Sequence, residues 1–151
     1  MRLILFWVLG IPAVALVWLV TTGWIIPSYA NGRALAHIRA SGSAVIDLTK
    51  AVPSDWDRVC VLGPYSTDTI AATTLGFDWK VDMHSSIGSS DSISLIVFEK
   101  HGKVVRDIDV PRRDGDFSNL SGRCFPRDHA KFVLKPLAPG AWPYVVPEDA
   151  A

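Results

Sequence analysis

The N-terminal segment constrains this chain more than any other feature, because residues 3–26 form an apolar stretch (LILFWVLGIPAVALVWLVTTGWII) without a formal charge. A helix rises about 1.5 Å per residue, so about 20 apolar residues cross the hydrocarbon core of a bilayer. Trp7 and Trp24 stand near the two ends of the stretch, where aromatic side chains anchor membrane helices. The sequence therefore predicts an N-terminal transmembrane anchor over residues 1–30, which contacts membrane lipid through residues 3–26.

A cleaved signal peptide is the competing interpretation of this segment. Ser28, Tyr29 and Ala30 form a small-x-small cleavage site. The apolar stretch is, however, longer than the core of about 7–15 residues that signal peptides carry, and Arg2 is the only charged side chain before it. We expect an uncleaved anchor, with secretion after cleavage near Ala30 as the alternative.

Two signals disagree about the side of the membrane on which the rest of the chain folds. Arg33, Arg39 and Lys50 follow the apolar stretch, so a count of positive charges places the C-terminal side in the cytoplasm. A polar head as short as Arg2 is easily retained inside, and the cysteines favour export. We expect a single-pass protein of the inner (cytoplasmic) membrane with a periplasmic C-terminal domain.

The chain has two cysteines, Cys60 and Cys124, whose wide spacing matches neither a zinc site nor a redox motif. An even number of cysteines in an exported domain favours a disulfide. Closing a loop of this length stabilises a domain by about 4 kcal/mol if the effect is entropic. For a cytosolic domain, two unrelated buried thiols are the alternative.

The remaining sequence predicts three parts: a short helical stalk over residues 31–43, one soluble domain over residues 44–135, and a proline-rich extended tail over residues 136–151. In the domain, β-branched and apolar residues predict strands at 44–48, 58–62, 92–100, 103–110 and 129–134, with a further extended piece at 77–82. Ser66 as N-cap and Gly76 as C-terminal stop frame one firm helix. This pattern predicts an α+β fold: a small, mostly antiparallel sheet with one main helix.

The strand predicted at 92–100 carries apolar residues on both of its faces. Ile93, Leu95 and Val97 share one face, and Ile96 and Phe98 share the other. His101 and Gly102 predict a two-residue hairpin turn to the next strand. We therefore expect this strand to be covered on both sides.

Two short motifs flank the predicted central strand: W-D-x-V at residues 56–59 and G-P-Y-[ST] at residues 63–66. With them, the chain resembles a family of small bacterial membrane-anchored proteins and lipoproteins that has no known function. The resemblance covers roughly residues 45–133 and implies a single domain in the bacterial envelope. It implies no biochemical activity, and because no cysteine follows the apolar stretch, a lipid-modified cysteine is excluded.

Charge and motif content exclude several functional classes. The 15 basic and 15 acidic side chains give a formal net charge of zero, without a basic stripe, so nucleic acid is not an expected partner. Asp82 and His84 supply only two potential metal ligands, which does not define a metal site. We predict neither a metal nor a cofactor.

The candidates for catalysis are Asp82 and residues of the polar loop at 84–91 (HSSIGSSD). His84 with Asp82 or Asp91 and a neighbouring serine supplies the residue types of a Ser–His–Asp hydrolase. The nucleophile elbow G-x-S-x-G is absent. A small envelope hydrolase that uses His84 is therefore an alternative function.

The favoured function is a non-enzymatic module that binds a protein or another component of the bacterial envelope. Aromatic side chains dominate protein interfaces, so Trp56, Tyr65, Trp79 and Trp142 are the candidate binding residues. For Trp56 and Tyr65 the competing interpretation is structural, as anchors that pack over the strand ends. An immunity protein against a toxin that acts outside the cytoplasm is a second alternative.

Overall fold

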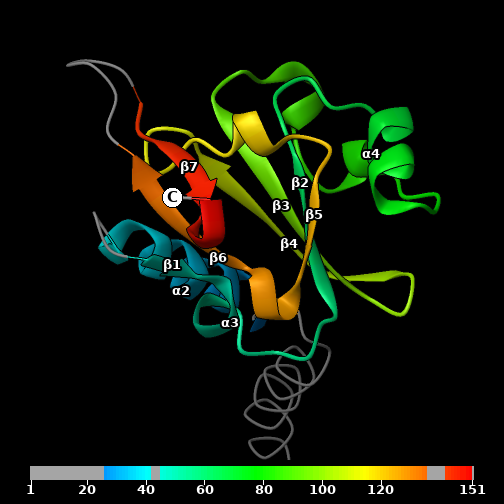
Figure 1. Ribbon diagram of the computed structural model, residues 1–151. Coiled ribbons are helices and arrows are strands. Elements are labelled where there is room, and N and C mark those ends of the chain that lie inside the picture. Colours follow the sequence, from blue (N-terminus) through cyan, green and yellow to red (C-terminus); the bar gives the residue numbers. More distant parts are fainter. Residues whose placement is uncertain (1–25, 42–44, 136–141, 151) are drawn as a thin grey trace, which may run out of the picture. The chain divides into compact units, whose positions relative to one another are not determined.

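The computed structural model describes residues 26–41, 45–135 and 142–150 (Figure 1). The chain divides into two compact units, Met1–Arg33 and Ala34–Ala151. The apolar stretch on which the anchor prediction depends lies outside the described residues. Among the helices that are described, none combines the length and the apolar character that a membrane crossing requires.

The unit that begins at Ala34 is a small α+β domain with two antiparallel sheets. The larger sheet has the strand order β4-β3-β2-β5, with β2 at Arg58–Leu62, β3 at Ile93–Lys100, β4 at Lys103–Pro111 and β5 at Cys124–Pro126. The smaller sheet has the order β1-β6-β7, with β1 at Val45–Asp47, β6 at Lys131–Lys135 and β7 at Tyr144–Pro147. The predicted α+β class and antiparallel pairing are thus confirmed, but the strands form two sheets where one was predicted.

Within the described residues, the helices are few and mostly short. The α-helices are α2 (Ile26–Ser41), α3 (Leu48–Ala51) and α4 (Asp68–Leu75). Single turns of 3₁₀ helix follow along the chain: η1 (Val81–Met83), η2 (Ile87–Ser89), η3 (Ser118–Leu120), η4 (Arg127–His129) and η5 (Glu148–Ala150). The extended piece predicted at residues 77–82 is therefore wrong at its end, where Val81 is buried in the first turn of η1.

The larger sheet separates two hydrophobic cores. In Figure 1, α4 lies on one side of this sheet, and α3 and the smaller sheet lie on the other. The first core contains Ile96 and Phe98 of β3 together with residues of α2, α3 and the smaller sheet. The second core contains Leu95 and Val97 together with residues of α4, η1 and η2. The prediction that β3 is covered on both faces is confirmed.

The ends of α4 and the turn between β3 and β4 are determined by residues next to them in the sequence. Gly76 ends α4 in the left-handed conformation, with φ of 81°, as its role as a stop residue predicts. The N-cap is Thr67 rather than Ser66, because the Ser66 hydroxyl donates to the carbonyl of Gly63 instead. His101 and Gly102, with φ of 51° and 73°, form the turn between β3 and β4, since two successive positive φ angles suit a two-residue hairpin.

The structure differs from the sequence prediction at both ends of the domain. The helix predicted in the stalk is present, but Ala34 and Ile38 of α2 are fully buried in the first core, so from Ala34 this helix packs as part of the domain instead of standing apart from it. The strands β5 and β7 were not predicted. Each is three or four residues long and next to prolines, and each forms only because a longer strand, β2 or β6, supplies its hydrogen-bond partners.

Candidate functional site

The W-D motif has a structural role. The Trp56 side chain is 1% exposed, and its indole nitrogen donates to the carbonyl of Val52 at 2.8 Å. The Arg127 guanidinium covers one face of the ring at 4.5 Å, and the ring of Phe98 lies edge-on at 5.1 Å. The Asp57 carboxylate accepts a hydrogen bond from the backbone of the β3–β4 turn. Trp56 is therefore not accessible to a partner, and it serves as a structural anchor within the core.

The G-P-Y-S motif forms a turn that places Tyr65 in an unfavourable backbone conformation. The Ser66 amide donates to the Gly63 carbonyl at 3.3 Å, and Pro64 and Tyr65 occupy the two central positions. A proline followed by a positive φ defines a type II turn, in which glycine or asparagine is the usual third residue. Tyr65 has φ of 61°, although bulky residues rarely adopt a positive φ.

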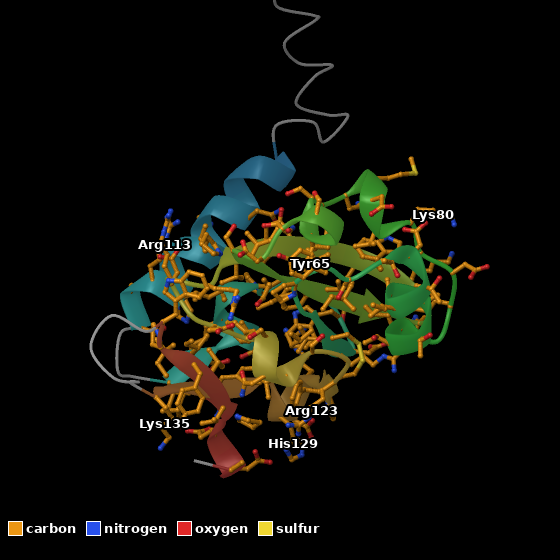
Figure 2. All side chains as sticks on the ribbon, turned by 90° about the horizontal axis from the view of Figure 1, so that it is seen from above. Tyr65, Lys80, Arg113, Arg123, His129 and Lys135 are labelled. Carbon is orange, nitrogen blue, oxygen red and sulfur yellow. A yellow bond between two sulfur atoms is a disulfide. The ribbon has the colours of Figure 1, made fainter. Side chains whose placement is uncertain are left out.

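The surrounding backbone holds Tyr65 in this conformation while its side chain stays exposed. The Tyr65 amide donates to the carbonyl of Ile87 in η2 at 2.9 Å. Tyr65 is 58% exposed, compared with 39% for Trp142 and 1% for Trp56 (Figure 2). Backbone strain of this kind costs about 1–3 kcal/mol and persists only where neighbouring contacts over-determine it. Folding alone gives no reason to keep a tyrosine at this position.

Gly63 fixes the start of this turn against the loop that precedes β5. The Gly63 amide donates to the Ser121 hydroxyl at 2.9 Å. A Cβ atom at position 63 would lie 2.8 Å from the Ser121 side chain, which is closer than such atoms approach. Only glycine allows this contact, so the turn that carries Tyr65 and the Ser121 loop are held together.

A shallow groove of about 450 Å³ lies between α4 and this loop, lined by Thr69, Ile70, Thr73, Thr74, Ser121 and Gly122. None of these described lining residues carries a charge. The hydroxyls of Thr73 and Thr74 each donate to the helix carbonyl four residues earlier, so those donors are already used. Tyr65 does not line the groove itself, but the turn that carries it joins the two walls, because Gly63 contacts Ser121 and Thr67 caps α4. We call Tyr65 together with this groove the Tyr65 surface.

Trp79 and His84, predicted for binding and for catalysis, lie against each other. Their rings are 4.7 Å apart, and Trp79 also packs against the second core. The His84 Nδ1 atom lies 3.5 Å from a carboxylate oxygen of Asp107 on β4. Burial raises the pKa of Asp107, and the nearby His84 opposes this effect. This histidine–carboxylate pair was missed because Asp107 belongs to a distant strand.

The other predicted catalytic residues are not joined to His84. The backbone amide of Asp82 donates to Asp68, and the carbonyl of Asp91 accepts a hydrogen bond from Arg112. Ser85 donates its hydroxyl proton to Asp109, whereas a nucleophilic serine donates to its histidine. In the described part of the chain, no hydrogen bond or ion pair joins His84 to Asp82, Asp91 or a serine, and no three residues are grouped to hold a metal.

Trp142 belongs to a group of contacts at the C-terminal strand β7, formed with Arg112 and Asp116, which we call the clasp. The Arg112 guanidinium lies 4.6 Å from the centre of its ring, and the same guanidinium binds both carboxylate oxygens of Asp116, at 2.9 and 2.8 Å. The backbone of Asp116 in turn exchanges hydrogen bonds with Pro143 and Val145. Trp142 is 39% exposed, so part of its ring remains accessible.

The clasp predicts an acid-sensitive contribution to stability. Burial alone would raise the pKa of Asp116, but hydrogen bonds from Arg112 and Ser118 outweigh it and hold this pKa below its usual range. Stability from a depressed pKa is present above the unfolded pKa, near 4, and is lost as the pH falls through the folded pKa. We expect Asp116→Asn to lower the free energy of unfolding at pH 7 by about 1–2 kcal/mol.

This difference between Asp116→Asn and the wild type should shrink as the pH falls from 4 toward 2, as measured by urea denaturation across that range. Asp128→Asn is the matched control, because the Asp128 side chain is 79% exposed. A difference from the wild type that stays constant down to pH 2 would show that the ionised carboxylate contributes nothing.

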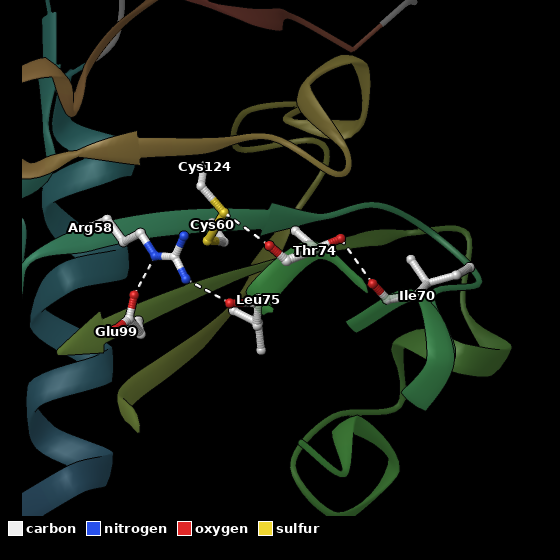
Figure 3. The surroundings of a disulfide bond; sticks show 7 residues. All are labelled: Arg58, Cys60, Ile70, Thr74, Leu75, Glu99 and Cys124. Carbon is white, nitrogen blue, oxygen red and sulfur yellow. Dashed lines mark hydrogen bonds and ion pairs between the residues drawn. A yellow bond between two sulfur atoms is a disulfide. The ribbon is translucent and has the colours of Figure 1, made fainter. Parts of the chain in front are cut away.

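The predicted disulfide is confirmed, and it joins Cys60 to Cys124 at facing positions of β2 and β5 (Figure 3). The Cys124 sulfur lies 3.4 Å from the carbonyl oxygen of Thr74, near the end of α4. Arg58, two residues before Cys60, donates to the Leu75 carbonyl at 2.6 Å and pairs with the buried Glu99. The end of α4 is thus fastened to β2 beside the disulfide.

Comparisons with known proteins give no further guidance: no family model, no curated protein and no solved structure matches this chain. The resemblance inferred from the W-D-x-V and G-P-Y-[ST] motifs therefore stays a prediction. The candidate site has to be judged on its own geometry.

Proposed function

We propose that this protein is a membrane-anchored, extracytoplasmic module that binds another protein of the bacterial envelope through the Tyr65 surface. The observation that carries the proposal is Tyr65 itself: an exposed aromatic side chain at a turn position where glycine or asparagine fits without strain. Strained residues of this kind gather at binding and catalytic sites. Tyrosine is also among the side chains that contribute most to protein interfaces.

Two observations support the location. The 24 uncharged residues at positions 3–26 have the length and composition of a membrane anchor. A disulfide between Cys60 and Cys124 suits an oxidising compartment, since cytosolic thiols are kept reduced. We propose a single-pass protein of the inner membrane, with the domain on the periplasmic side.

Cell fractionation combined with intact-mass analysis tests this location. The membrane fraction should contain the full-length mass, and both cysteines should resist alkylation until a reductant is added. A product found in the cytosol with two reactive thiols would contradict the location. A mass that begins after Ala30 would replace the anchor with a cleaved signal.

Binding at the Tyr65 surface is tested by photo-crosslinking in the native host. Benzoylphenylalanine at position 65 keeps an aromatic ring in place and should give discrete crosslinked species with an envelope protein. The same residue at Val105 is the matched control, because Val105 is also exposed, at 46%, but lies on β4. Equal crosslinking from both positions, or none from position 65, would contradict the proposal.

Tyr65→Gly should separate folding from binding. Glycine adopts a positive φ without strain, so the free energy of unfolding should stay unchanged or rise by about 1 kcal/mol. Capture of the crosslinked partner should fall at least tenfold, because the aromatic contact is gone. The measurements are urea denaturation and co-purification from solubilised membranes.

Tyr65→Asn is the companion variant, since asparagine also tolerates this backbone conformation and retains a polar side chain. It should fold as well as Tyr65→Gly and bind as weakly. If Tyr65→Gly folds and still captures the partner at the wild-type level, Tyr65 has no part in binding.

A further inference from the structure

The strand β5 is held in the sheet by few contacts. It lies at the edge, pairs only with β2, and contributes three residues to the register. A pair of this length has little stability of its own. Two side chains secure it on opposite faces: Phe125 packs in the first core against Phe132, and Cys124 forms the disulfide beside the second core.

The segment Ser121–Arg123, just before β5, continues along β2 toward the G-P-Y-S turn. The Val61 amide donates to Arg123 and the Gly122 amide donates to Val61, both at 2.9 Å. Ser121 then accepts the hydrogen bond from Gly63. Ser121, Gly122 and Arg123 are all exposed. Besides these hydrogen bonds, the segment is held by turn hydrogen bonds from the Ser121 and Arg123 amides and by the Arg123 guanidinium, which lies 5.0 Å from the centre of the Phe125 ring. Its ends are fixed by the buried Leu120 and by the disulfide.

The disulfide therefore touches both walls of the groove. On one side, the Cys124 sulfur lies against the carbonyl of Thr74, which lines the α4 wall. On the other, Cys124 continues directly into Arg123, Gly122 and Ser121, two of which line the opposite wall. Figure 3 shows the sulfur atoms between β2, β5 and the end of α4.

We propose that the Cys60–Cys124 disulfide keeps Ser121–Arg123 in place only while it is oxidised. We call it a redox-sensitive fastener of the Tyr65 surface in this sense. In the oxidised protein, Ser121–Arg123 is held against β2 and forms one wall of the groove. In the reduced protein, this segment detaches from β2, the Gly63–Ser121 contact is lost, and the partner surface is incomplete. The loss of partner binding rests on the proposed function, whereas the detachment of Ser121–Arg123 does not.

The reaction is a thiol–disulfide exchange with a dithiol reductant. A thiolate of the reductant attacks the Cys124 sulfur, the more accessible of the two since Cys60 is fully buried, and Cys60 leaves as a thiolate that takes up a proton. The second thiol of the reductant, as its thiolate, then attacks the reductant sulfur of the mixed disulfide, and Cys124 leaves as a thiolate that takes up a proton. The reductant ends as a disulfide, and the protein gains two electrons and two protons as two thiols.

Backbone order parameters from nuclear magnetic resonance test the proposal on the full chain in detergent micelles. In the oxidised protein, the amides of Gly122 and Arg123 should show values near 0.85, as in rigid backbone. After reduction with a dithiol they should fall below about 0.6, while Val97 in β3 stays near 0.85. The variant with Cys60→Ala and Cys124→Ala should match the reduced protein.

Two results would overturn the proposal: unchanged order at Gly122 and Arg123 after reduction, or an equal loss of order in β3, which marks a general loosening of the domain. Ser121→Ala keeps the disulfide and removes only the acceptor for Gly63, so its Gly122 and Arg123 should remain ordered. Crosslinking from position 65 in oxidised and reduced protein then reports the effect on binding. Loss of order without crosslinks in either state would overturn the proposed function and leave the fastener intact.

Discussion

Replacing Trp56 with alanine is expected to lower the free energy of unfolding by about 3–5 kcal/mol, the usual cost of truncating a buried tryptophan. The ring fills the first core beside Phe98, and its removal also leaves the Val52 carbonyl without its donor and Arg127 without its stacking partner. Urea denaturation of the wild type and the variant measures the difference.

Two comparisons sharpen this result. Trp56→Phe retains most of the apolar contact and loses the indole donor, so it should cost clearly less, about 1–2 kcal/mol. Trp142→Ala removes a ring that is 39% exposed and should cost less than Trp56→Ala. A loss below about 1 kcal/mol for Trp56→Ala would show that the W-D motif does not hold the first core together.

Loss of the disulfide is expected to have an effect of similar size. The bond closes a loop with a sequence separation of 64 residues, which contains β3, β4 and α4. Constraining such a loop in the unfolded chain contributes about 4 kcal/mol. The variant with Cys60→Ala and Cys124→Ala should therefore unfold at a markedly lower urea concentration than the oxidised wild type.

Reduced wild-type protein is the matched control for this variant, because it has the same open loop but keeps both sulfur atoms. The two should unfold at nearly the same urea concentration. If the reduced wild type were as stable as the oxidised protein, the bond would contribute nothing to stability, and any effect of the alanine variant would come from packing alone.

Sequence reasoning located the elements whose signals are local. The helix α4 follows from its capping residues and Gly76, and the β3–β4 hairpin follows from two apolar runs around His101 and Gly102. The disulfide followed from the cysteine count together with the expected export. Each of these inferences needs only neighbouring residues or a simple pairing rule.

The elements that were missed depend on distant partners. The strand β7 pairs with β6 across residues 136–141, and the pairing of His84 with Asp107 depends on how η1 is placed over β4. For Tyr65, a signal was present, because proline at the second position of a turn favours type II geometry. A type II turn was not predicted, however, because its third position usually holds glycine or asparagine and here holds tyrosine.

The alternation of side chains along β3 means that adjacent residues respond to different halves of the domain. Even-numbered positions such as Ile96 and Phe98 pack with α2 and the smaller sheet, and odd-numbered positions such as Leu95 and Val97 pack with α4. Conservative truncations at odd and at even positions would therefore loosen opposite sides of one strand. Whether a substitution in β3 affects the core beneath α4 or the core that contains α2 therefore depends on whether the residue number is odd or even.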